Sequence, residues 1–148
     1  MKNQNIVVIA MAAALAFALA PVTGATPCPD WGCGPQLPEI SIHSTSPSAT
    51  GYILRGQTGS FVLARNPLLP GATYVNFKVS GTAIPGVDYT ALISPAYIGP
   101  TGYAVLSVKT LPNPRASFND QAYSVVVTLE PGPGYSLRTP SSATMWIK

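Results

Sequence analysis

Residues 79–92 read VSGTAIPGVDYTAL, and the residues just before them, 73–78, read TYVNFK. From residue 73 to residue 80 apolar and polar side chains alternate, which is typical of a half-buried β-strand because successive side chains of a strand point to opposite faces. Gly81 and Gly86 can take backbone conformations that other residues avoid, and Pro85 presets a turn. The stretch therefore predicts a strand that ends in a tight corner.

Five other segments show the same alternation and are separated by turns rich in glycine and proline. They are residues 39–44, 60–64, 102–110, 122–130 and 142–148. The side chains expected to point inward from all six segments are Ile40, Ile42, Phe61, Leu63, Val75, Phe77, Val79, Ala104, Leu106, Val108, Tyr123, Val125, Val127, Leu129, Ala143, Met145 and Ile147. Six or seven such strands predict an all-β fold, an antiparallel β-sandwich of immunoglobulin-like type.

The composition agrees with one β domain and excludes several classes of protein. The chain has 148 residues, of which 16 are proline and 13 glycine, and 47% of its residues are hydrophobic. Interior prolines exclude long helices, and the hydrophobic content is too high for a disordered chain. The 8 basic and 5 acidic residues are spread singly, so the chain has no basic stripe for a nucleic acid.

Residues 1–25 are typical of a signal peptide. Lys2 precedes the apolar residues 6–20, and Thr23-Gly24-Ala25 ends in small residues, which predicts cleavage after Ala25. An uncleaved membrane anchor is the alternative, but 15 apolar residues fall short of the roughly 20 that a spanning helix needs. We therefore expect export to the extracellular space, the cell surface or the periplasm, with no membrane attachment after cleavage.

Residues 26–38 form a proline-rich arm that contains both cysteines of the chain. Export would place Cys28 and Cys33 in an oxidising compartment, which favours a disulfide between them. Free or intermolecular thiols are the alternative. Residues 39–148 then make up the sandwich.

Four quoted segments resemble the Calx-beta domain family, a module common in secreted bacterial proteins. VSGTAIPGVDYTAL resembles the core motif of the family, and RGQTGSFVLAR at residues 55–65 resembles its early strand. SVVVTLEPGPGYSL at residues 124–137 and SSATMWI at residues 141–147 resemble the penultimate and closing strands. The resemblance covers residues 38–148 and implies a seven-stranded Greek-key sandwich in a secreted, single-domain member of the family.

The resemblance also implies where a calcium site would lie. Calcium-binding members of the family gather several carboxylates from loops at one end of the sandwich, as a hard cation requires. Asp88 keeps one of these acidic positions and Asp120 falls on another, whereas Tyr123 and the loop at residues 112–115 supply no carboxylate. A further acidic position falls on Arg55.

We therefore expect a degenerate calcium site and no cofactor. Two carboxylates, Asp88 and Asp120, cannot coordinate calcium tightly, and Arg55 would place a fixed positive charge there and pair with Asp88, Asp120 or both. A calcium-binding domain is the alternative. Asp88 can also act simply by fixing the corner, as an acceptor for N–H groups of the turn.

The remaining features favour a non-enzymatic module for extracellular binding, adhesion or assembly, such as a filament or matrix subunit. His43, the single histidine, stands beside Ser44 and Thr45 without a catalytic motif, so a secreted enzyme is a distant alternative. The side chains expected to point outward as contact candidates are Tyr103, Val105, Val126 and Trp146. Partners would be another protein, a carbohydrate, or a second copy joined through edge strands, with residues 39–44 as the donated strand.

Overall fold

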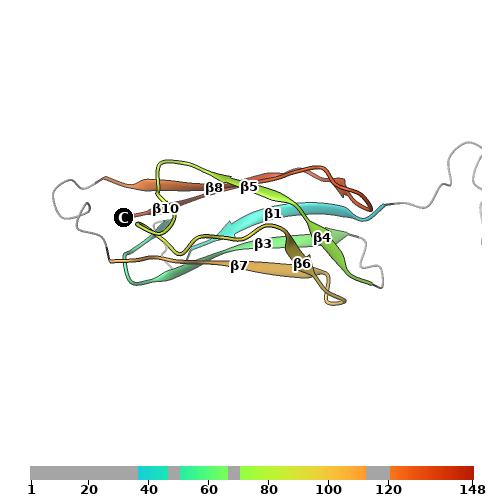
Figure 1. Cartoon of the computed structure of the whole chain (residues 1–148), viewed down its shortest axis with the longest axis horizontal. Coiled ribbons are helices and arrows are strands. Elements are labelled where there is room, and N and C mark those ends of the chain that lie inside the picture. Colours follow the sequence, from blue (N-terminus) through green and yellow to red (C-terminus); the bar gives the residue numbers. More distant parts are fainter. Residues whose placement is uncertain (1–36, 47–50, 67–70, 113–120) are drawn as a thin grey trace, which may run out of the picture. The chain divides into compact units, whose positions relative to one another are not determined.

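The computed structural model describes residues 37–46, 51–66, 71–112 and 121–148 (Figure 1). These residues form ten β-strands and no helix. The strands are β1 (Glu39–Thr45), β2 (Tyr52–Ile53), β3 (Thr58–Asn66), β4 (Thr73–Val75), β5 (Phe77–Ser80), β6 (Ala96–Ile98), β7 (Tyr103–Lys109), β8 (Tyr123–Leu129), β9 (Ser136–Leu137) and β10 (Ser142–Ile147). The expected signal peptide, the Cys28–Cys33 disulfide and Asp120 lie outside the described residues.

Two four-stranded sheets face each other, and a two-stranded sheet accompanies them (Figure 1). The first sheet has the order β7-β3-β1-β9 and the second the order β2-β10-β8-β5, while β4 pairs with β6. The long strands pair antiparallel, with Ile42 opposite Leu63 in the first sheet and Met145 opposite Val125 in the second. The predicted all-β sandwich is confirmed.

Alternation along the strands places the core between the two sheets, as expected from the sequence. The fully buried apolar side chains of β1, β3, β8 and β10 are Ile40, Ile42, Phe61, Leu63, Val125, Val127, Met145 and Ile147. Val79, Ala104, Leu106, Tyr123 and Ala143 were also expected to point inward, and they pack against this core while remaining partly exposed. The period of two in the sequence therefore predicts the buried face of each long strand.

The structure differs from the sequence-based prediction at residues 73–80, which form two strands rather than one. The chain changes sheets at Asn76, so that Val75 pairs with Ala96 in β6 whereas Phe77 pairs with Leu129 in β8. The backbone N–H of Asn76 donates to the Tyr135 hydroxyl at 3.1 Å instead of to a strand. Alternation continues through this break and cannot reveal it.

The strand count and the pairing directions also differ from the prediction of about seven antiparallel strands. The added strands β2, β6 and β9 have two or three residues each, too few to show a periodic pattern. Two of them pair in parallel, β2 with β10 and β9 with β1. No helix within the described ranges has the length and apolar character needed to cross a membrane.

Candidate functional site

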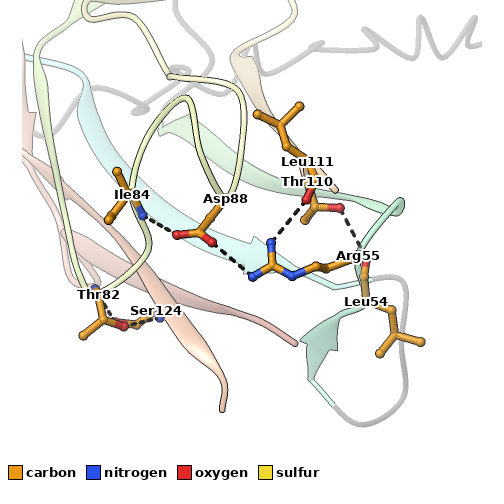
Figure 2. A network of polar contacts seen from close by, with 8 residues as sticks. All are labelled: Leu54, Arg55, Thr82, Ile84, Asp88, Thr110, Leu111 and Ser124. Carbon is orange, nitrogen blue, oxygen red and sulfur yellow. Dashed lines mark hydrogen bonds and ion pairs between the residues drawn. The ribbon is translucent and has the colours of Figure 1, made fainter. Parts of the chain in front are cut away.

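The corner expected at residues 81–89 is built on two glycines with left-handed backbone conformations. Gly81 has a φ of 120° and Gly86 a φ of 79°. A Cβ at Gly81 would lie 2.2 Å from the carbonyl oxygen of Ser124, so the chain passes β8 at a distance that only glycine permits. The Thr82 hydroxyl accepts a hydrogen bond from the Ser124 N–H at 2.8 Å, which ties the corner to β8 (Figure 2).

Asp88 closes this corner from within. Its side chain is fully buried, and its Oδ2 accepts a hydrogen bond from the Ile84 N–H at 2.7 Å (Figure 2). The Asp88 N–H in turn donates to the Ile84 carbonyl at 2.8 Å. The carboxylate thus caps the turn that contains Gly86, which is the corner-fixing role expected from the sequence.

Arg55, from the turn between β2 and β3, reaches the other oxygen of this carboxylate. Its Nη2 lies 3.0 Å from Asp88 Oδ1, and its Nη1 donates to the Leu111 carbonyl at 3.2 Å (Figure 2). The Arg55 side chain is 14% exposed, and its guanidinium lies 5.9 Å from the centroid of the Tyr123 ring. A largely desolvated charge pair of this kind is held by hydrogen bonds as well as by attraction.

The end of β7 completes the corner. The Thr110 hydroxyl donates to the Gln57 carbonyl at 2.7 Å, and the Leu111 N–H donates to the Asp88 carbonyl at 2.9 Å. The chain that follows Arg55 and the backbone of Asp88 are therefore tied to the same end of β7. The Arg55–Asp88 ion pair therefore joins two segments that these hydrogen bonds already hold close together.

Tyr89 follows Asp88 and is also buried. Burial raises the pKa of the Tyr89 hydroxyl above its ordinary value near 10, and the negative charge of Asp88 raises it further. The hydroxyl therefore stays neutral through the physiological range.

Among the residues that the structure describes, the donor set at this corner does not fit calcium. Calcium takes six to eight oxygen ligands, whereas the Asp88 carboxylate already accepts bonds from Ile84 and from the Arg55 guanidinium. Within the described ranges no three His, Cys, Asp or Glu side chains come together in a way that could hold a metal ion. A cation at Asp88 would also be repelled by the guanidinium 3.0 Å from Oδ1.

Of the residues singled out in the sequence, the structure brings Arg55 and Asp88 together, whereas Asp120 falls outside the described residues. The four outward contact candidates do not form one surface. Tyr103 and Val105 lie on β7 in the first sheet, while Val126 and Trp146 lie on β8 and β10 in the second. Tyr103, Val105 and Trp146 are exposed, but Val126 is only half-exposed.

The partners that the corner takes from the backbone were not predicted, because the Ile84 N–H and the Leu111 carbonyl carry no signal in the side-chain pattern. Arg65 was not predicted as a functional or structural residue either. Its guanidinium is buried and donates to the Gly71 carbonyl at 3.0 Å and to the Thr73 hydroxyl at 3.2 Å. An arginine at an inward position of β3 was the available signal, because Arg65 follows Phe61 and Leu63 in the alternation.

Solved structures of other proteins share the fold of this chain, although no similar sequence was found. No family model matches the sequence, and no curated protein is similar to it. Among solved structures, the crystal structure of the apo-form Calx CBD1 domain is similar, with a TM-score of 0.57 over 76% of this chain and 96% of that one. The chain shares the Calx-beta fold.

A second solved structure gives the same result. The crystal structure of CBD12 from CALX1.2 matches with a TM-score of 0.57 over 74% of this chain, which covers 44% of that chain. Sequence identity to both domains is 15%. The Calx-beta fold is therefore shared, while the ligands of the corner must be judged from this chain's own residues.

Proposed function

We propose that the chain is an exported, non-enzymatic module of Calx-beta fold that acts in extracellular binding, adhesion or assembly. In this proposal the Arg55 guanidinium takes the place of a divalent cation at the corner. The observation that carries it is the bridge from Arg55 to the Asp88 carboxylate at 3.0 Å and to the Leu111 carbonyl at 3.2 Å. An arginine fork can join a carboxylate to a second acceptor without any exchangeable ion.

The surroundings of the single histidine support a non-enzymatic role. His43 lies on the exposed face of β1 opposite Val62. The neighbouring Ser44 hydroxyl donates to the Thr144 carbonyl at 2.9 Å rather than to the imidazole. A nucleophile activated by a base requires a hydrogen bond between the two, so these residues do not form such a pair.

A calcium-binding domain is the second candidate, and the shared Calx-beta fold favours it. The comparisons lend no such support to adhesion or assembly, which depend on the surface pattern of this chain. Calcium binding would require Asp88 to leave Arg55, and a ligand set would have to form from residues beyond those described. The positive charge of Arg55 beside Asp88 argues against calcium binding.

Calorimetric titration of the purified protein with calcium chloride tests the choice, with magnesium chloride as the control. We expect no binding heat from either ion, because the guanidinium already neutralises the Asp88 carboxylate. Specific binding of calcium with a micromolar dissociation constant would establish the second candidate instead. Sequencing the N-terminus of the secreted protein tests export separately, and a mature chain that begins at Thr26 is expected.

A further inference from the structure

β7 differs from the other edge strands of the two four-stranded sheets. The first sheet ends at β7 and β9, and the second sheet ends at β2 and β5. β2 and β9 have two residues each, and β5 has four with an exposed Lys78 in its interior. β7 has seven residues and no charge before its last residue, Lys109. Short length and interior charge are devices that keep edges from pairing, and β7 has neither.

The hydrogen bonds to β3 determine which backbone groups of β7 face outward. The Arg65 N–H donates to the Gly102 carbonyl at 2.8 Å, and the Thr110 N–H donates to the Gln57 carbonyl at 3.2 Å. Antiparallel ladders alternate between bonded and non-bonded pairs. Given the observed register, the groups of residues 104, 106 and 108 point to β3, and those of residues 103, 105 and 107 point away.

The outward backbone groups of β7 are not paired by the segment that runs from Thr90 to β6. At one end of the strand the Lys109 carbonyl accepts the Thr90 N–H at 2.9 Å, after which the chain turns to pair β6 with β4. Within the described residues, the outward N–H and C=O groups of Tyr103, Val105 and Ser107 make no hydrogen bond. They form an open, solvent-exposed ladder to which another extended strand can pair.

The side chains at this edge are neutral and partly apolar on both faces. On the outer face Tyr103 is 56% exposed and Val105 is 59% exposed, and Val105 lies opposite Val62 of β3. On the inner face Leu106 packs against the core but stays partly exposed. A strand added here would bury apolar surface as well as complete the ladder.

We propose that β7 pairs with β7 of a second copy of this chain, antiparallel and about a two-fold axis at Val105. This deepens the proposed function, on which it rests, by naming the partner. The two-fold axis sets Val105 opposite its own copy and Tyr103 opposite Ser107, and it engages all the open groups of residues 103, 105 and 107 in both copies. No charges of like sign face each other, because Lys109 lies opposite Thr101. The two first sheets, whose outer margin β7 forms (Figure 1), become one continuous sheet.

Sedimentation velocity of the purified protein between about 1 and 200 µM tests this pairing. Wild type is expected to pass from monomer to dimer as the concentration rises. Val105→Lys sets two lysines against each other at the axis and should weaken the dimer at least about tenfold. Thr144→Lys is the matched control, because it adds the same charge at an exposed position of β10 in the other sheet. It should leave the dimer unchanged.

Amide hydrogen exchange gives a second readout that does not depend on a variant. The amides of Tyr103, Val105 and Ser107 should exchange rapidly at low concentration and slow at least about tenfold in the dimer, while that of Leu106 is protected throughout. A wild-type chain that stays monomeric at 200 µM would overturn the proposal. A dimer that forms equally well with Val105→Lys would also overturn it, since association then uses another surface. Neither result depends on calcium, so the test fails separately from that of the proposed function.

Discussion

The corner contains an ion pair between the buried carboxylate of Asp88 and the largely buried guanidinium of Arg55. Removing two charges from water costs free energy, and their attraction and hydrogen bonds must offset that cost. Asp88 is fully buried and accepts a backbone N–H besides the guanidinium. Loss of either partner would leave the other charge in a poorly solvated place, which is where mutational effects on stability are largest.

A double-mutant cycle measures this coupling. Arg55→Met keeps the aliphatic packing but leaves the carboxylate uncompensated, and Asp88→Asn keeps the shape of the side chain but removes its charge. Each single variant should lower the free energy of unfolding by about 3 kcal/mol, as measured by urea denaturation. The double variant should lose clearly less than the sum, because the second change removes a charge that the first has stranded. Additive losses would mean that the two side chains do not act as a pair.

Tyr89 gives the corner a dependence on alkaline pH. Because its pKa is raised in the folded protein by burial and by Asp88, the unfolded chain releases this proton first, near pH 10. The stabilising contribution of the neutral hydroxyl is therefore complete below pH 10 and is lost as the pH rises through the folded pKa. Unfolding titrations between pH 8 and 11 should show a steeper fall for wild type than for Tyr89→Phe. Parallel curves would contradict the assignment.

At this scale the sequence predicted the side-chain partners and not the backbone partners. Arg55 could be placed near Asp88 because it falls on a position that is acidic in the family that the sequence resembles. The Leu111 carbonyl and the Ile84 N–H could not be foreseen, because every residue carries the same backbone groups. Only the fold determines which of them meet.

The segment that follows β5 shows how individual elements fix the corner. Gly81 and Gly86 both have positive φ, but only Gly81 lies against β8. A side chain at Gly86 would enter open space, whereas one at Gly81 would collide with the Ser124 carbonyl. A side chain at Gly86 would therefore cause backbone strain alone, whereas one at Gly81 would cause backbone strain and a steric clash.

Substituting each glycine by alanine tests that difference. Gly86→Ala should cost about 1 kcal/mol of unfolding free energy, from the strain of a left-handed conformation. Gly81→Ala should cost at least about 3 kcal/mol, because β5 and β8 must also move apart. Urea denaturation of both variants provides the measurement, and equal losses would rule out the close approach to Ser124.

The long strands β7 and β8 carry enough apolar alternation to reveal both their extent and their buried face. For β3 the alternation predicts only residues 60–64, because glycine and arginine occupy the inward positions at its two ends, Gly59 and Arg65, and the strand runs from Thr58 to Asn66. The break at Asn76 escaped prediction because alternation continues through it while the hydrogen-bond partners change. The two-residue strands β2 and β9 depend on neighbours far away in the sequence, which local patterns do not contain.

For the whole molecule, the shared Calx-beta fold does not determine the chemistry of the corner. The fold is that of domains at 15% sequence identity, which leaves room for the charges at a corner to be replaced. A module held by an ion pair needs no metal for its stability. A metal-binding module gains free energy from its ion in proportion to the logarithm of the ion's concentration.

Thermal unfolding of the purified protein in millimolar calcium and in a calcium chelator tests this account most directly. If Arg55 stands in for the ion, the two midpoints should agree within experimental error. Calcium at about 1,000 times its dissociation constant would stabilise a binding domain by about 4 kcal/mol, which corresponds to a rise of roughly 15 °C in the midpoint. A rise of that size in wild type would contradict the account.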